Sequence, residues 1–476
     1  MVKVKNKGNL TEGPLFTRIF LFVIPIVLTG VLQVAYNIAD NIVVGRFSGD
    51  PTALAAVGST GSLTGLITGF LLGIASGSGV VIAHFFGAKE YNEVSKTVHT
   101  AMLFSLIGGV FFMLLGLVIS EPALVLMKTK PEILDKSVLY IRIICLGIPA
   151  ASVYNFGAAT LRSVGNSKMP LLILSVSGII NVALNFVFVI LCNMSVAGVA
   201  IATIASQYAS AVWVVLFLMT RKESCYQLSL KKLKLEKRLL IRILRLGLPA
   251  GIQSSLFSIS NVLIMSAFNT FPTTTVSGRT IAINIENLLY TSLNAYMQAA
   301  MTFIGQNYGA KKNRRLNKVF IYSVVQVLIF AVLVCFTISM FKTPLSILFM
   351  DPEDPNKELV LEVVERIFNL LLPTYFLCGL MDTLAGILRG FGYSIMSMIS
   401  SLIGLGIRVL WTLFVFPLEK FNTIEGITIS YPISWAITAM LSLLFCGYVW
   451  HKLGIWKGAR LEKENESKNI NKEITV

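Results

Sequence analysis

Long apolar runs separated by short polar segments make up most of the chain. An α-helix rises 1.5 Å per residue, so about 20 apolar residues cross the hydrocarbon core of a bilayer. Runs of that length predict twelve membrane-spanning helices, at 16–44, 53–84, 98–120, 138–160, 169–192, 195–219, 241–268, 279–305, 318–341, 360–387, 394–416 and 427–451. Prolines inside four runs should bend them, at Pro25, Pro149, Pro249 and Pro373. The predicted fold class is an all-α integral membrane protein.

Composition and charge agree with this class. Hydrophobic residues make up 55% of the chain and charged residues only 13%, about half the share in soluble proteins. With both termini in the cytoplasm, inside segments hold 29 of the Lys and Arg residues and outside loops hold 9. The positive-inside rule therefore accounts for the net charge of +16, and no nucleic-acid partner is needed. We expect a monomeric multi-pass protein of the plasma (inner) membrane of a bacterium, with the lipid bilayer as its surroundings.

The two halves of the chain resemble each other. RIFLFVIP at 18–25 is similar to RILRLGLP at 242–249, and LRSVGNS at 161–167 is similar to LRGFGYS at 388–394. These matches, and those of Gly87 with Gly309 and of Pro149 with Pro373, share offsets between 222 and 227 residues. An even number of helices per half gives both halves one topology, a known plan of transporters. We predict two pseudo-symmetric six-helix bundles around a central cleft.

The bounds predicted for these parts follow from the basic stretch between the halves. They are an N-terminal bundle at 1–220, a basic cytoplasmic linker at 221–240, a C-terminal bundle at 241–455 and a polar cytoplasmic tail at 456–476.

Polar residues inside the N-terminal runs are spaced so that they share helix faces. Asp40 lies in the first run, with Tyr36 four residues and Asn37 three residues before it. A carboxylate in a span is costly and marks a functional candidate. We expect Tyr36 and Asn37 to contact substrate. The competing interpretation of Asp40 is an acid at the membrane interface.

The fifth and sixth runs repeat this four-residue spacing, with Asn181 and Asn185 in one and Thr203 and Gln207 in the other. Compatible depths in the membrane predict one cluster of Asp40, Asn181, Asn185 and Thr203, with Gln207 toward the substrate. Its oxygen atoms suit Na⁺ or a proton, and no other metal or cofactor is expected. The alternative is hydrogen bonding between helices.

The C-terminal half does not copy this cluster, because the positions of Asn181 and Asn185 become Arg408 and Thr412 at an offset of 227. Its own buried charges are Glu286, Asp382 and Arg408. We expect Glu286 to face the cleft and contact substrate. Asp382 and Arg408 are either functional or an internal ion pair.

The cysteines and histidines are too scattered to indicate a disulfide frame or a metal site. No Ser/His or paired-carboxylate arrangement indicates an enzyme.

Taken together, these features resemble the MATE (multidrug and toxic compound extrusion) family. The first helix with Pro25 and Asp40, the GQNYGAKK stretch at 305–312, the LRSVGNS and LRGFGYS motifs and AGVAIAT at 197–203 carry the resemblance. It implies antiport, in which Na⁺ or H⁺ enters and amphipathic, often cationic, compounds leave. It also implies a cation site at Asp40, Asn181, Asn185 and Thr203, although some members have Asp where this chain has Asn185. Family acids in the seventh and tenth helices are replaced here by Phe257 and Cys378.

From the residues and this resemblance we expect secondary active multidrug efflux by rocking of the two bundles, with Pro25 as a hinge. The alternative is a lipid-linked oligosaccharide flippase of the same superfamily, which should have several basic residues in its cleft. When the basic residues are assigned to segments, all except Arg142 and Arg408 are counted with the inside segments or the outside loops, at or near the span ends.

Overall fold

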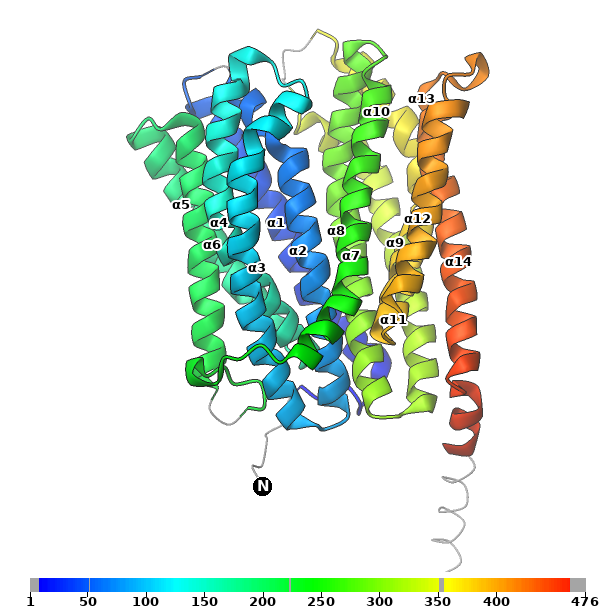
Figure 1. Cartoon of the computed structure of the whole chain (residues 1–476). Coiled ribbons are helices and arrows are strands. Elements are labelled where there is room, and N and C mark those ends of the chain that lie inside the picture. The colour runs from blue at the N-terminus through cyan, green and yellow to red at the C-terminus, as the bar shows by residue number, and fades with distance from the viewer. Residues whose placement is uncertain (1–7, 51, 222–223, 351–354, 463–476) are drawn as a thin grey trace, which may run out of the picture. The chain divides into compact units, whose positions relative to one another are not determined.

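The computed structural model describes residues 8–50, 52–221, 224–350 and 355–462, and these residues form helices and connecting turns without a strand (Figure 1). Its first half contains α1 (Leu15–Phe47), α2 (Ala53–Gly87), α3 (Tyr91–Leu126), α4 (Pro131–Ser163), α5 (Lys168–Asn185) and α6 (Ser195–Thr220). Its second half contains α7 (Lys237–Phe268), α8 (Thr273–Gly309), α9 (Asn313–Ile347), α10 (Lys357–Leu371), α11 (Phe376–Gly390), α12 (Ser394–Leu410), α13 (Ile424–Thr428) and α14 (Ser430–Lys452). Of the predicted tail, residues 463–476 lie outside the described residues.

The predicted all-α membrane class is confirmed. Within the described ranges, ten helices are long and apolar enough to cross a membrane, and the bent pair α10–α11 makes an eleventh. The remaining predicted span, 279–305, lies in α8, which has 37 residues. This helix carries Arg279, Glu286 and several amide side chains, so it is less apolar than the others.

The contacts divide the chain into two compact units, and each unit takes part of a helix from the other half of the sequence. Of the described residues, unit 1 contains those up to Asn9 and those between 28 and 255, and unit 2 contains residues 10–27 and those from Leu256 onward. The start of α1 therefore packs in unit 2, where Phe22 contacts Phe303 edge-to-face at 5.6 Å between ring centroids. The start of α7 packs in unit 1, where the backbone of Gly247 lies against Gly77 of α2.

The prolines affect their helices differently. Pro25, Pro149 and Pro249 lie inside helices that continue past them. Pro373 lies in a 3₁₀ turn, Leu372–Thr374, where α10 and α11 meet at 47°. Since proline removes a backbone donor, the break at Pro373 agrees with the expected effect.

The internal repeat is visible in unusual backbone conformations. Lys89 and Lys311, 222 residues apart, have φ values of 61° and 55° after α2 and α8. Gly165 and Gly392 have φ values of 86° and 91° after α4 and α11, where glycine avoids the penalty of a side chain.

A π-helical turn also occurs in both units. Phe186–Leu191 follows α5, and Trp411–Val415 follows α12. Such turns are rare and occur often near functional sites.

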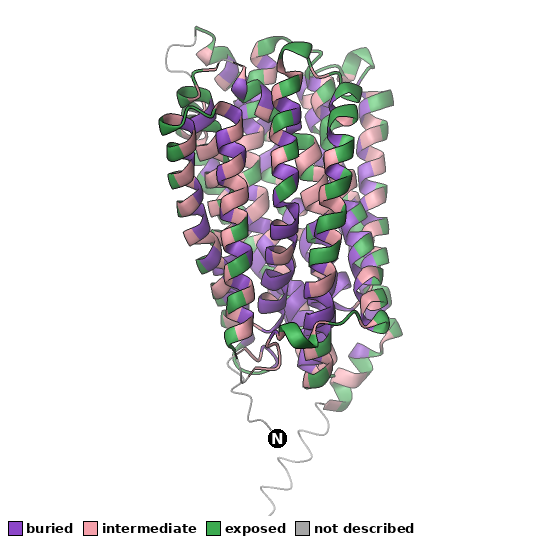
Figure 2. Ribbon diagram, turned by 60° about the vertical axis from the view of Figure 1, so that its left-hand side comes forward, coloured by how far each residue is buried: buried purple, intermediate pink, exposed green. Residues whose placement is uncertain are grey.

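The long helices have buried and exposed faces along their length (Figure 2). On α3 and α9, the exposed faces carry large apolar side chains such as Phe111, Val118, Phe336 and Met340. A surface of this kind fits a hydrocarbon solvent rather than water.

Candidate functional site

Asp40 of α1 is joined to two other helices of unit 1. The side-chain amide of Asn185, the last residue of α5, donates to Asp40 Oδ1 over 2.5 Å. The hydroxyl of Thr203 on α6 lies 3.4 Å from Asp40 Oδ2 and also donates to the carbonyl of Val199 over 2.9 Å. The structure therefore brings together the carboxylate and the two polar helices that the sequence spacing predicts.

Asn181 completes this cluster, because its amide lies 3.5 Å from the Thr203 hydroxyl and its oxygen lies 3.4 Å from Asn185 Nδ2. Asn181 and Asn185 are buried, whereas Asp40 and Thr203 are partly accessible. Asn185 Oδ1 is buried and has no hydrogen-bond partner. The cluster thus presents carboxylate, amide and hydroxyl oxygens, the ligand set of a hard cation such as Na⁺ or of a proton.

A valine-rich group lies beside this cluster. It includes Val43 and Val44 of α1, Val189 of the π turn and Val199 of α6, with Tyr140 of α4 packed against it. Tyr140 also lies within electrostatic range of Asp40. Sequence spacing did not single out Tyr140, because spacing within α4 does not show which of its faces packs against the valine-rich group.

The other residues predicted for the N-terminal site have different surroundings. Tyr36 donates to the backbone carbonyl of Ser175 on α5 over 3.2 Å. Asn37 is exposed, and the side chain of Gln207 lies against Gly147 of α4. One connected group is therefore formed by Asp40, Asn181, Asn185 and Thr203. Tyr36 lies instead at the contact between α1 and α5, and Gln207 at the contact between α6 and α4.

Unit 2 contains a different charged group, centred on Arg279 and Glu286 of α8. Their guanidinium and carboxylate meet at 2.5 Å and 3.4 Å, and Arg279 Nη2 donates to the hydroxyl of Tyr431 over 2.9 Å. The predicted span begins at Arg279, whereas α8 begins six residues earlier, at Thr273, and Arg279 is 3% exposed. Glu286 is therefore bound to a neighbouring cation within its own helix.

Arg408 and Asp382 do not form the ion pair considered from the sequence. Arg408 of α12 donates to the hydroxyl of Ser434 over 2.8 Å and 3.2 Å and lies over the ring of Tyr431. Asp382 of α11 has Asn294 and Tyr290 of α8 as polar neighbours and Arg389 as a cation within electrostatic range, and its Oδ2 atom is buried without a hydrogen-bond partner.

The missed pairs share one spacing. Arg279 with Glu286, and Asp382 with Arg389, are each seven residues apart on one helix. Seven residues are nearly two full turns, so both side chains lie on one face. This spacing is the sequence signal that would have found both pairs.

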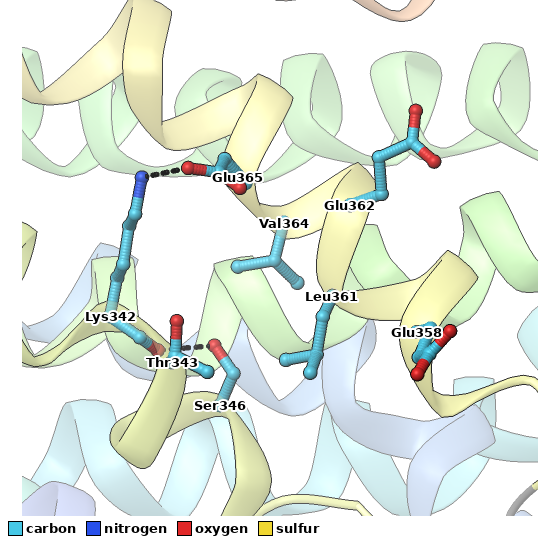
Figure 3. A pocket seen from close by; sticks show the side chains of 8 residues that line it. All are labelled: Lys342, Thr343, Ser346, Glu358, Leu361, Glu362, Val364 and Glu365. Carbon is cyan, nitrogen blue, oxygen red and sulfur yellow. Dashed lines mark hydrogen bonds and ion pairs between the residues drawn. The ribbon is translucent and has the colours of Figure 1, made fainter.

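A pocket of about 290 Å³ lies between α9 and α10 of unit 2 (Figure 3). Glu358, Glu362 and Glu365 line it opposite Lys342, whose amine bonds Glu365 over 2.5 Å. Glu365 is 56% exposed, so this pair is a surface ion pair. Among the described residues, no three His, Cys, Asp or Glu side chains are grouped as metal ligands.

Comparison with known proteins places the chain in a family. The MatE family model matches residues 25–187 and 249–414, which together form most of both halves. A relative from Bacillus subtilis (strain 168), named probable multidrug resistance protein YoeA, is 27% identical over 91% of this chain and 93% of its own length.

A more distant relative and a solved structure extend this comparison. A protein of Shewanella oneidensis named FAD transporter is 22% identical over 94% of this chain and 96% of its own. The fold matches a structure described as the outward-facing conformation of a multidrug resistance MATE family transporter, with a TM-score of 0.84 and 21% identity over 95% of this chain and 99% of that one. The chain therefore belongs to the MatE family and is a multi-pass membrane protein of this transporter class.

Proposed function

We propose that the chain exports amphipathic, cationic organic compounds across the inner membrane of a bacterium, by antiport against Na⁺ or H⁺. The observation that supports this most directly is the joining of Asp40 to Asn185 and Thr203 within unit 1. A carboxylate in a low-dielectric setting attracts either a small cation or a cationic compound, and one charge cannot satisfy both at once. Competition for Asp40 would couple entry of the ion to exit of the compound.

The surroundings of Asp40 fit the part of an ion ligand. Asn185 Oδ1 is buried without a partner, and Asn181 Oδ1 and the Thr203 hydroxyl lie within the same group. An ion that bound beside Asp40 would find these oxygen atoms already close together, so the helices would not have to be rebuilt to supply ligands. Protonation of the carboxylate would remove the same charge by another route.

Alternating access requires a part that moves, and α1 is suited to it. Residues of α1 up to Val27 belong to unit 2, and those from Leu28 belong to unit 1. Pro25 lies two residues before this division and leaves one backbone carbonyl of the helix without its usual donor. A bend at Pro25 would move Asp40 relative to the start of the helix, which supports the proposed hinge.

The multidrug names of the relatives favour drug export over flipping of lipid-linked oligosaccharides, the alternative function. The relative named FAD transporter indicates that acidic molecules are carried within the family, so the substrate test should include more than cations.

The test uses purified protein in liposomes, with a fluorescent lipophilic cation and separately imposed Na⁺ and pH gradients. We expect one of the two gradients to drive movement of the dye. Asp40→Asn should abolish gradient-driven movement and leave the protein folded, whereas Asn41→Ala, an exposed neighbour on the same helix, should leave that movement intact. Dye movement that ignores both gradients, or that survives Asp40→Asn in full, would overturn the proposal.

A further inference from the structure

Two arginines of unit 2 share one aromatic partner in the interior. The guanidinium carbons of Arg279 and Arg408 lie 5.3 Å and 4.4 Å from the ring centroid of Tyr431. Their side chains come from α8 and α12 and are 3% and 2% exposed. Buried arginines are rare in membrane spans and are normally paired with acids or lie at a ligand pathway.

The charges of this cluster do not balance. Glu286 is bonded to Arg279 through both oxygens. Arg408 has the neutral hydroxyl of Ser434 and the rings of Tyr431 and Phe257 as partners. Two guanidinium groups therefore share one carboxylate, and Arg279 Nε is buried without an acceptor. The group carries a net positive charge and at least one donor that an anion could use.

The cluster occupies the position in unit 2 that the Asp40 cluster occupies in unit 1. Asn181 and Asn185 correspond to Arg408 and Thr412 at an offset of 227, just before or within the two π turns. At an offset of 228, Thr203 and Ser206 correspond to Tyr431 and Ser434.

The local hydrogen bonds repeat at these positions. Ser206 donates to the carbonyl of Thr203, and Ser434 donates to the carbonyl of Tyr431, each over 2.8 Å. The scaffold of the site is thus duplicated, whereas its central charge has changed from acid to base.

We propose that Arg408 and Arg279 bind an anionic group of the transported molecule, a carboxylate, sulfonate or phosphate. This inference rests on the proposed function, since it names a second chemical feature of the same cargo. The planar fork of a guanidinium matches such oxyanions through two parallel hydrogen bonds. In the absence of substrate, the carboxylate of Glu286 binds Arg279. The anionic group of an incoming substrate competes with Glu286 for that guanidinium.

This proposal reverses the expected effect of removing Glu286. If Glu286 binds the positive part of a substrate, Glu286→Gln weakens binding. If Glu286 competes with an acid for Arg279, the same substitution strengthens binding of that acid. The size of the protein and of its cavities is nearly unchanged by the exchange of carboxylate for amide.

The test compares two dyes that differ in one group. Rhodamine 19 carries a free carboxylate, and rhodamine 6G is its ethyl ester. Their binding to the purified full-length protein in detergent is measured by fluorescence anisotropy, which does not depend on transport. We expect Arg408→Gln to weaken binding of rhodamine 19 by about tenfold, as for loss of one charge-assisted pair, and to leave rhodamine 6G unchanged. Arg408→Lys should restore part of the loss, and Glu286→Gln should tighten binding of rhodamine 19 alone.

Arg142→Gln is the matched control, since Arg142 forms a half-exposed ion pair with Glu121 in unit 1 and should leave both dyes unaffected. Equal loss of both dyes in Arg408→Gln, or weaker binding of rhodamine 19 in Glu286→Gln, would overturn the proposal.

A third arm replaces chloride by gluconate without dye. If chloride raises the melting temperature in an Arg408-dependent way while the two dyes bind alike, the anion is inorganic and the assignment to the cargo is wrong. Failure of the proposed function would appear separately, as dye movement in liposomes that ignores both ion gradients while these binding differences persist.

Discussion

Asn185 donates its side-chain amide to the carboxylate of Asp40 over 2.5 Å and so links the end of α5 to α1. The two residues are 145 positions apart in the sequence. Asn185 is fully buried and is followed at once by a π-helical turn. The position and orientation of the Asp40 carboxylate therefore depend on the neutral side chain of Asn185 from α5 as well as on the backbone of α1.

Replacing Asn185 by leucine, which has a similar shape, should reduce gradient-driven dye transport by about 10- to 100-fold. The range corresponds to loss of about 1.5–3 kcal/mol, typical of a hydrogen bond to a charged group. Initial rates in proteoliposomes measure the effect. Asn41→Leu, at an exposed position of α1 next to Asp40, is the control. Equal rates for the two variants would show that Asn185 does not act through Asp40.

Substitution of Gly178 should disturb the contact between α5 and α1. A Cβ atom at Gly178 would lie 1.7 Å from Tyr36 Cζ, so the tyrosine ring must move and lose its bond to Ser175. We expect Gly178→Ala to destabilise the protein by about 1–3 kcal/mol, as for other overpacked sites. Thermal unfolding in detergent measures this.

The control for this prediction is Gly406→Ala in α12, where a Cβ would meet no atom within 4 Å. It should be neutral or slightly stabilising, because alanine favours helix over glycine by about 1 kcal/mol. Adding Tyr36→Ala to Gly178→Ala should recover much of the loss, and no recovery would exclude the steric explanation.

Removing Glu286 should leave Arg279 buried without its counter-charge. Glu286→Leu is expected to cost about 3–5 kcal/mol of stability, and the double variant with Arg279→Leu should cost less than that single change. A double-mutant cycle of melting temperatures gives the coupling. Glu365→Leu, which breaks an exposed pair with Lys342, should cost at most about 1 kcal/mol. Similar losses in Glu286→Leu and Glu365→Leu would contradict the buried pair.

The stability of the protein at acid pH should depend on whether the carboxyl group of Asp50, in the loop after α1, is ionised. Hydrogen bonds from Lys136, followed by those from Thr52, lower the pKa of the Asp50 carboxyl to about 2. Because this folded-state pKa is below the unfolded value of about 3.9, the contribution is present above pH 4 and is lost as pH falls toward 2.

The difference in melting temperature between wild type and Asp50→Asn should therefore be constant from about pH 5 to pH 8 and should shrink below about pH 4. Its size should be that of an exposed pair, about 0.2–1 kcal/mol. Lys136→Met should remove most of the difference. A difference that grows as the pH falls would have the wrong sign for a carboxyl with a lowered pKa.

Much of the fold could be predicted because a span requires a long apolar run, and each predicted run falls on one helix or on consecutive helical segments. The convergence of Asp40, Asn181, Asn185 and Thr203 could be predicted because spacings of four residues place side chains on one face. The sequence could not show which faces meet. It therefore did not reveal that Tyr36 bonds Ser175, or that Tyr140 packs beside the cluster.

The second half was harder to predict for a physical reason. A buried arginine can form an ion pair with an acid two turns away on the same helix, because the arginine side chain is long enough to reach that acid. Arg279 with Glu286 uses this reach, so a charge at the very start of the predicted span neutralises a carboxylate that had no partner in the sequence pattern. The division of α1 at residue 27 likewise depends on long-range contacts that leave no local pattern.

The paired π-helical turns after α5 and α12 bear on the history of the chain. A turn of this kind accommodates one surplus residue, so every side chain beyond it points in a different direction from that of an uninterrupted helix. The surplus occurs at the same place in both halves. A shared irregularity of this kind is expected if both halves descend from one duplicated segment, and the opposite charges beside its two copies are then expected to have arisen after the duplication.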